Sequence, residues 1–403
     1  MEQLVVLGNG FDLACQLKSK YSDFYQSKYK EPYKSLLDEF CLNISKINMH
    51  EKIGSTVDFF NKLEDDKEFE QLLESSNALN IWDIIFGSRF YENVKSKSWT
   101  DIEQTIEKYI IRLYRACIKG EDRASYLPII VVLEFKMRVK WENLVHEIEQ
   151  KGEKIEFAWE YYSEILLEQL NKFENNFTAY LNGAINNRVY KQSVSELFME
   201  IIQRYDAEGT SRKISLNELT TNVLSFNYTE VEKVGQQKNV LINEFRNVHG
   251  KLSRARDGII FGIDLQQLKK SESDETRDNQ QSFLEFTKTF RTLKMVKSFG
   301  TQKLYSKETK QIKFYGHGLG EADYSYFMSI FDAVELYSGE TVLVFFYNPD
   351  LEDEEAKQFR RVANLIIKYA ETLKNENHGD NLLHKLILEN RIKILPLAYS
   401  VEK

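Results

Sequence analysis

Four short stretches beside apolar runs carry the residue types best suited to chemistry in this 403-residue chain, three of them directly after such a run and one before it. Glycine lets a ligand approach the backbone closely, an asparagine amide donates and accepts hydrogen bonds, and an imidazole exchanges a proton near neutral pH. Glycine-bordered loops beside an amide and a base suit a phosphate-bearing ligand and general base chemistry on it. The stretches contain Gly8, Asn9 and Gly10; Asn227; Asn247, His249 and Gly250; and Gly316, His317 and Gly318, with Asp323 shortly after.

The apolar runs beside these stretches indicate strands that are buried on both faces. They are apolar throughout rather than alternating with polar residues, and several are followed by a helical pattern of apolar residues. We therefore expect an α/β fold, with a Rossmann-like, mostly parallel sheet covered by helices and with ligands at the carboxyl ends of the strands. The expected strands are residues 4–7, 222–226, 258–263, 312–316, 341–347 and 391–397.

A long helical section separates the first expected strand from the others. Apolar residues recur there at spacings of three and four, with charged residues between them and few prolines. We therefore predict a Rossmann-like nucleotide-binding domain from residues 1–30 and 216–403, interrupted by an all-helical insertion domain at residues 31–215. The clearest helical segments are 34–47, 101–118, 131–150 and 157–185.

Composition narrows the class of protein. A formal net charge of −8 argues against a general binder of polyanions, so nucleic acid is not an expected partner. Cys15, Cys41 and Cys117 are isolated in sequence, which predicts a protein without a zinc site, and with no metal required, in a reduced, cytoplasmic setting. No apolar segment approaches the roughly 20 residues that a membrane-spanning helix needs, so a membrane partner is not expected either.

Each stretch also has a purely structural interpretation. Residues 8–10 could form a tight turn between strand and helix, or their backbone N–H groups could hold a phosphate at the helix N-terminus. Asp12 would repel a bare phosphate from the first helical turn, and it fits a ribose or a backbone amide better. Asn227 could cap a helix that begins near Thr229, and His249 could be a satisfied histidine in a turn. Four such stretches at one sheet edge favour a composite nucleotide site.

Several motifs together resemble the AbiH family of bacterial abortive-infection, anti-phage proteins. The opening Gly-Asn-Gly-Phe-Asp-Leu, together with Tyr-Ser-Asp-Phe at 21–24, is the most specific of them. The resemblance implies a role in phage defence, with a phage-derived trigger or partner protein. The motifs, spread over nearly the whole chain, are LVVLGNGFDLACQLKSKYSDF, WTDIEQTIEKY, LSFNYTEVEK, NVHGKL, IIFGID and FYGHGLGEADYSYF.

The order of the stretches also resembles, at a greater distance, the sirtuin-like NAD-binding domains of phage-defence NADases. In those domains a glycine loop holds the NAD pyrophosphate, an asparagine contacts the nicotinamide ribose and positions water, and a histidine acts as base or ribose anchor. The resemblance therefore implies a hydrolase of the NAD⁺ nucleosidase type, with NAD as substrate or ligand. It assigns Gly8, Asn9 and Gly10 to the phosphates with Asp12 beside them, Asn227 and His249 to the chemistry, and Gly316, His317 and Asp323 to the adenosine side.

The chain departs from the sirtuin deacylases at identifiable places. It lacks cysteines spaced for their four-cysteine zinc module, and a helical insertion occupies that part of the chain. Asn9 stands where the sirtuin pattern has an alanine, and His317 stands where it has the serine of a Gly-Ser pair. Deacylation of acyl-lysine is therefore not expected, and the identity of the nucleotide stays open.

Two other functions also stay open. The site could belong to a sensor or scaffold that binds a nucleotide without chemistry. A nuclease is the other alternative, because Asp101, Glu103 and Glu107 share a helix face and could bind Mg²⁺, although a solvated acidic stripe explains them as well. Glu103 could instead reach the nucleotide site from the insertion, and Asp264 could be a strand-end cap or a catalytic acid. The aromatic residues of the helical section fit a bundle core or self-association into a homo-oligomer.

Overall fold

Contacts among the described residues of the computed structural model divide the chain into two units. The sheet unit comprises Met1–Ser19, Thr178–Ile260 and Thr292–Lys403, and the helical unit comprises Lys20–Phe177 and Phe261–Arg291. The structure describes residues 1–46, 79–86, 99–119, 129–130, 132–133, 135–137, 140–141, 159–186, 188–207, 210–213, 219–231, 242–252, 258–263, 280–294, 303–373 and 379–398.

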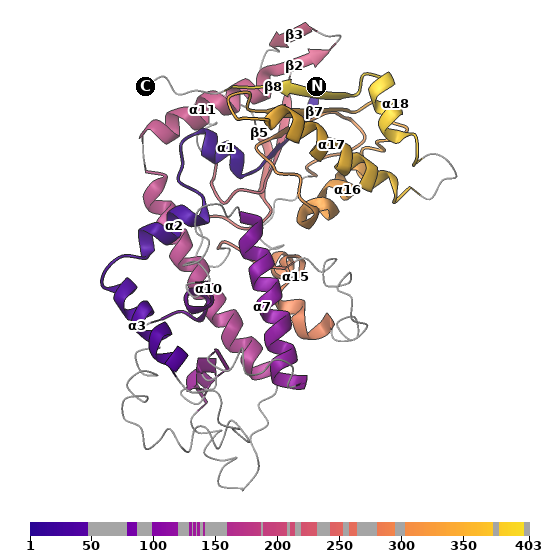
Figure 1. The fold of residues 1–403 in the computed structure, drawn as a ribbon. Coiled ribbons are helices and arrows are strands. Elements are labelled where there is room, and N and C mark those ends of the chain that lie inside the picture. Colours follow the sequence, from indigo (N-terminus) through magenta and orange to yellow (C-terminus); the bar gives the residue numbers. More distant parts are fainter. Residues whose placement is uncertain are drawn as a thin grey trace. The chain divides into compact units, whose positions relative to one another are not determined.

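The described part of the sheet unit contains a six-stranded sheet in the order β5-β4-β1-β6-β7-β8, and every neighbouring pair is parallel. Counted along the chain, these strands run third, second, first, fourth, fifth, sixth, which is the order of the doubly wound dinucleotide-binding fold. The predicted α/β, Rossmann-like class is confirmed. The strands are β1 Glu2–Leu7, β4 Thr220–Ser225, β5 Ile242–Asn247, β6 Thr309–Tyr315, β7 Val342–Tyr347 and β8 Ile392–Pro396 (Figure 1).

Helices cover both faces of this sheet because its central strands are apolar on both sides. In β1, Leu4 and Val6 belong to one buried cluster, and Val5 and Leu7 belong to another. Residues of α16, α17 and α18 complete the first cluster, and residues of α1 and α11 complete the second (Figure 1). These helices are α1 Asn9–Ala14, α11 Arg188–Gln203, α16 Tyr324–Ala333, α17 Glu354–Ala370 and α18 Leu382–Leu388.

One expected strand is not part of the sheet, and a different segment supplies the edge. Residues 258–263 belong to no strand, and among the described residues they pair through a single bridge, between Ile263 and Thr287. The prediction of a strand at 258–263 is therefore wrong. The edge strand β5 has the sequence INEFRN and is mostly half-buried. An edge strand with one partly solvated face does not need an apolar run, so a search for apolar runs in the sequence did not identify β5.

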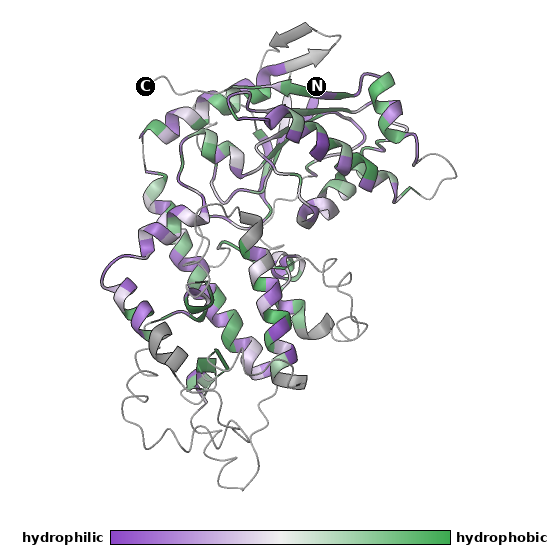
Figure 2. Ribbon diagram, viewed as in Figure 1, coloured by the Kyte–Doolittle hydropathy of each residue, from purple (hydrophilic) through white to green (hydrophobic). Residues whose placement is uncertain are grey.

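Aromatic packing holds the helical unit together. Phe173 of α10 lies 5.7 Å from Tyr21, 5.8 Å from Phe24 and 5.5 Å from Phe86, measured between ring centroids. Hydrophobic and hydrophilic residues are interleaved along α7 and α10, as expected for helices with one buried side (Figure 2). The elements are α2 Tyr21–Lys28, α3 Tyr33–Lys46, α7 Trp99–Lys119, α10 Trp159–Ala184, η4 Gln280–Phe286 and α15 Lys288–Lys294, and the last residues of α10 and α15 are counted with the sheet unit.

Two shorter features complete the described sheet unit. An antiparallel pair is formed by β2 Arg204–Ala207 and β3 Thr210–Lys213, and a 3₁₀ turn, η6 Glu321–Asp323, precedes α16. None of the helices in the described ranges has a stretch long and apolar enough to span a membrane.

Candidate functional site

The strand order reverses between β1 and β6, and the glycine loops that follow these two strands lie against each other. The Gly8 N–H donates to the carbonyl of Tyr315 at 3.0 Å, and the Gly10 N–H donates to the carbonyl of Gly316 at 2.8 Å. Ligands of open parallel sheets bind outside the carboxyl ends of the strands at such a reversal. Both glycine loops that the sequence singled out therefore occur at the position where this fold accommodates a ligand.

Backbone packing requires glycine at three positions of these loops. Gly316 has a φ of +68°, and a Cβ there would lie 2.3 Å from the backbone nitrogen of Phe11. A Cβ on Gly8 would lie 2.5 Å from the Cα of His317, and a Cβ on Gly10 would lie 2.7 Å from the Cα of Gly316. Side chains cannot be accommodated at such distances without moving the backbone. The close contact between the loops is therefore sufficient to explain these three glycines.

The polar side chains of the first loop face the protein. The Oδ1 of Asn9 accepts a hydrogen bond from the Ser19 hydroxyl at 2.6 Å. Asp12 is buried, and its carboxylate accepts from the hydroxyls of Tyr190 at 2.7 Å and Thr229 at 3.0 Å. Burial raises the pKa of Asp12 to about 7, and the two hydrogen bonds oppose that shift. Asp12 thus contacts two protein hydroxyls, where the sequence suggested a ribose or a backbone amide.

Asn227 follows β4 and Asn247 is the last residue of β5, and the two asparagines make different contacts in the fold. The Nδ2 of Asn247 donates to the carbonyls of Asn227 and Thr229 at 2.8 and 3.0 Å, which fixes the turn after β4. Asn227 is 3% exposed, yet neither its Oδ1 nor its Nδ2 has a hydrogen-bond partner among the described residues. A buried polar group left unsatisfied costs about 1–3 kcal/mol, and such groups are rare in native structures. The described fold therefore gives no structural reason for the Asn227 amide.

Asp323 joins the two histidines of this edge. Its Oδ2 lies 3.3 Å from Nε2 of His317, and its Oδ1 lies 3.7 Å from Nε2 of the buried His249. The Leu319 N–H donates to Nδ1 of His317 at 2.9 Å, so a neutral His317 carries its proton on Nε2, toward the carboxylate. The residue that the sirtuin-like resemblance assigned to the adenosine side therefore forms one cluster with both imidazoles.

Aromatic rings surround this cluster. The Phe226 ring lies 4.5 Å from the His317 ring and 5.6 Å from the His249 ring, measured between centroids. Tyr326 of α16 lies 5.5 Å from Phe226 and 6.1 Å from His249. Sequence reasoning did not select Phe226 or Tyr326, nor the Tyr190 that binds Asp12. Aromatic residues within strands and amphipathic helices have the same pattern as ordinary core residues, so the sequence contained no signal that distinguished them.

The parallel sheet brings the expected tips to one edge. Residues 8–10 follow β1, Asn227 follows β4, His249 follows β5, and Gly316 and His317 follow β6. These four strands are neighbours in the order β5-β4-β1-β6. Because they are parallel, their carboxyl ends all lie on the same side of the sheet. The arrangement combines a buried amide, two imidazoles and a carboxylate beside two glycine loops.

The acidic residues considered for a nuclease have other surroundings. Glu103 on α7 forms a largely buried ion pair with Lys288, with 2.8 Å between Oε2 and Nζ, inside the helical unit. Asp264 and the side chain of Asp101 lie outside the described residues. In the part of the chain that the structure describes, no group of three or more His, Cys, Asp or Glu residues could hold a metal ion.

Comparison with models of protein families identifies a match that covers most of the chain. The family described as bacteriophage abortive infection AbiH matches residues 4–347, a range that contains all of the strand tips of the site. A search of curated proteins finds no match, and a search of solved structures finds none either. The motif resemblance to the same family is thus confirmed across the sheet unit and the helical unit. The chain belongs to the bacteriophage abortive infection AbiH family.

Proposed function

We propose that this AbiH protein acts in phage defence by hydrolysing NAD at the carboxyl edge of its parallel sheet. Membership of an abortive-infection family supports the defence role. The strand order supports a nucleotide ligand, because doubly wound sheets of this order bind dinucleotides where the order reverses. The sirtuin-like order of glycine loop, asparagine and histidine along the chain favours NAD among the nucleotides.

The observation that carries the proposal is the unsatisfied amide of Asn227. Its Oδ1 and Nδ2 are buried and lack partners among the described residues, so folding alone leaves an energetic cost at this position. A ribose hydroxyl or a water molecule both donates and accepts hydrogen bonds, and either would satisfy the amide. His249, which follows the adjacent strand, supplies an imidazole that can accept a proton from that water.

The proposed reaction needs one water molecule. The bond between C1′ of the nicotinamide ribose and the nicotinamide nitrogen breaks, and its electron pair leaves with the nicotinamide. The water oxygen then bonds to C1′, and a proton of that water passes to His249, which yields ADP-ribose. In this scheme Asn227 orients the water and the ribose, and Asp323 orients the imidazole.

The contact between the glycine loop and the pyrophosphate stays a prediction. The N–H groups of Gly8 and Gly10 already donate to Tyr315 and Gly316, and α1 has only six residues. In this proposal a phosphate contacts the loop through the Asn9 N–H. The two glycines, which have no side chains, let it approach the backbone closely. In the same proposal, Gly316 and His317 lie toward the adenosine.

The test is to incubate the purified protein with NAD, alone and with an extract of phage-infected cells, and to follow nicotinamide and ADP-ribose by mass spectrometry. We expect Asn227→Ala and His249→Ala each to lower the rate by about 100-fold or more, as expected when a water-orienting group or a base is removed. Circular dichroism and thermal unfolding should show that both variants keep the fold.

Matched controls exist in the same unit. Asn243→Ala replaces an exposed asparagine at the start of β5, and His384→Ala replaces an exposed histidine on α18. Both should keep the full rate. Unchanged NAD under every condition, or equal rates in site and control variants, contradicts the hydrolase proposal. A calorimetric titration in which NAD or ADP-ribose binds without turnover would favour a nucleotide sensor instead.

A further inference from the structure

Asn247 carries a second buried polar atom for which the described fold provides no partner. The residue is 1% exposed at the end of β5, and its Nδ2 uses both N–H groups, on the carbonyls of Asn227 and Thr229. Its Oδ1 is buried and has no hydrogen-bond partner among the described residues. An exchange of the amide nitrogen and oxygen would place an oxygen against two carbonyl oxygens, so the contacts determine the orientation of this amide. Asn247 therefore holds an acceptor in a fixed position where a donor is missing.

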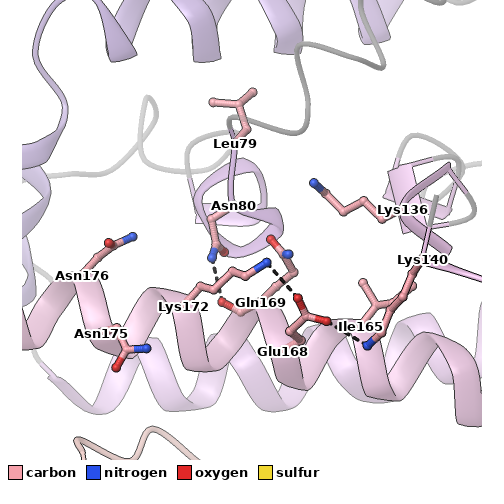
Figure 3. A pocket seen from close by; sticks show the side chains of 10 residues that line it. All are labelled: Leu79, Asn80, Lys136, Lys140, Ile165, Glu168, Gln169, Lys172, Asn175 and Asn176. Carbon is pink, nitrogen blue, oxygen red and sulfur yellow. Dashed lines mark hydrogen bonds and ion pairs between the residues drawn. The ribbon is translucent and has the colours of Figure 1, made fainter. Parts of the chain in front are cut away.

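A buried asparagine of the helical unit shows the contacts of an amide that serves the fold alone. The Nδ2 of Asn80 donates to the carbonyl of Gln169 at 2.7 Å (Figure 3), and its Oδ1 accepts from the Trp82 N–H at 2.8 Å. Both ends of that amide are satisfied, as is usual for a buried polar group. Within the described residues, Asn247 satisfies only its nitrogen, and the side chain of Asn227 satisfies neither end.

The amides of Asn227 and Asn247 belong to one hydrogen-bonded turn. Ser225, the last residue of β4, pairs with Asn247 in the parallel register. The Asn227 N–H donates to the Ser225 hydroxyl at 3.2 Å, and the Asn227 carbonyl accepts from Asn247 at 2.8 Å. Among the described residues, the two side chains together leave two acceptor oxygens and one donor nitrogen without partners, and neither side chain is charged.

This set of groups matches a pair of neighbouring hydroxyls. Each hydroxyl donates one hydrogen bond and also accepts, so two hydroxyls can donate to the two Oδ1 atoms while one of them accepts from the Asn227 Nδ2. An ionised phosphate has only acceptor oxygens to present to the two Oδ1 atoms, and an apolar group would leave all three atoms unsatisfied. A ribose carries two hydroxyls on adjacent carbon atoms, so it satisfies the set.

We infer that Asn247 and Asn227 together recognise the two hydroxyls of a ribose, with the Asn247 Oδ1 accepting from one and the Asn227 Oδ1 from the other. The inference rests on the proposed function for the identity of this sugar, which is the nicotinamide ribose of NAD. Asn247 then has two roles, because its nitrogen holds the turn that carries Asn227 and its oxygen contacts the ligand. A sugar that lacks either hydroxyl leaves a buried acceptor unpaired, and the site discriminates against it.

The experiment is calorimetric titration of the intact protein with ADP-ribose, which the proposed reaction forms and does not consume. Two analogues each replace one of the two hydroxyls of its terminal ribose with fluorine, which cannot donate a hydrogen bond. Each analogue should bind about tenfold or more weakly than ADP-ribose, because a buried acceptor loses its donor. Equal affinities for the three ligands, or no binding of ADP-ribose, would overturn the inference.

Two variants separate contact with the ligand from a structural role. In Asn247→Ala one of the two fluorine penalties should disappear, because the acceptor that senses that hydroxyl is gone, and the other penalty should stay. In Asn227→Ala the pattern should be reversed, and this second variant tests the inference even if Asn247→Ala does not fold. If Asn247 only holds the turn, Asn247→Ala weakens all three ligands by the same factor, which overturns the inference. Asn80→Ala, which removes a buried amide bonded to backbone at both ends, should keep the wild-type affinities.

Hydrolysis of NAD is measured separately, so the two proposals can fail independently. Hydrolysis together with equal affinities for the three ligands would contradict the ribose contacts and leave the hydrolase proposal standing. Discrimination among the three ligands without any hydrolysis of NAD would support the ribose contacts and contradict the hydrolase proposal.

Discussion

The glycine tips, residues 8–10 and Gly316, and the polar tips, Asn227 and His249, lie at the same edge of the sheet and differ in what explains them. At the glycine tips, the steric demands of two touching loops account for the residue types. At the polar tips, a buried amide has no partner among the described residues. The difference teaches that the glycines of a loop that resembles a ligand site can be explained by packing alone. A buried polar group without a partner is not explained by packing and indicates a role in binding.

The largest expected effect tests the steric account of the glycine tips. Gly316→Ala places a Cβ 2.3 Å from the Phe11 nitrogen at a φ of +68°. We expect a loss of about 3 kcal/mol or more in the free energy of unfolding, because backbone strain and overpacking act together. Thermal and urea unfolding measure this change. Gly318→Ala is the control, because no described atom lies within 4 Å of its added Cβ. Similar stability losses in the two variants would contradict the steric account.

The next effect concerns Asp12, which connects the two kinds of tip by accepting a hydrogen bond from Thr229. Burial raises the pKa of Asp12 to about 7. Between about pH 4 and 7 the folded protein therefore holds a proton that the unfolded chain has released, so stability falls as pH rises through that window. Asp12→Asn cannot ionise, and it should flatten this fall and be more stable than the wild type at pH 8 by about 2–3 kcal/mol.

Urea unfolding of the Asp12→Asn variant and the wild type from pH 4 to 8 measures this difference. The stabilities of the two proteins should converge toward pH 4, because below the ordinary aspartate pKa of about 3.9 the carboxyl group is protonated in both the folded and the unfolded state. Asp350→Asn, at an exposed position after β7, should follow the wild-type profile. A variant less stable than the wild type at pH 8 would show that the ionised carboxylate is the form that the fold prefers.

The smallest expected effect is the difference in stability loss between alanine substitutions of Asn247 and Asn227. Asn247→Ala removes two hydrogen bonds to backbone carbonyls and should lower the free energy of unfolding by about 2 kcal/mol. Asn227→Ala removes no hydrogen bond within the described chain, so its stability should change by less than about 1 kcal/mol. Chemical denaturation of both variants measures the contrast. If Asn227→Ala were as destabilising as Asn247→Ala, the amide would have a structural role and the polar tips would resemble the glycine tips.

Much of the sheet could be predicted from the sequence because its central strands are buried on both faces. The runs at 4–7, 222–226 and 312–316 correspond to β1, β4 and β6, with boundaries that differ by a few residues. The edge strand β5 could not be found in this way, because its residues are polar and half-buried. The apolar run at 258–263 suggested a strand, although it is buried without joining the sheet.

The sequence predicted which residues belong to the candidate site, but it did not predict which side chains contact one another there. Glycine, asparagine and histidine beside apolar runs could be selected by type and position. The contact of Asp12 with Tyr190 involves residues 178 positions apart, and no local pattern marks it. The position of Asp323 between His249 and His317 depends on where η6 and α16 pack after β6.

The sequence by itself determined the α/β class, the family and four polar stretches beside apolar runs, because apolar runs and local motifs are properties of consecutive residues. Only the tertiary structure decided which of those residues serve the fold. These roles depend on atoms brought together from distant parts of the chain. Such atoms decide whether a position must be glycine, whether a carboxylate accepts hydrogen bonds from the protein and whether an amide has a partner. Close packing and hydrogen-bond satisfaction act between such atoms, so they are not encoded in any single stretch.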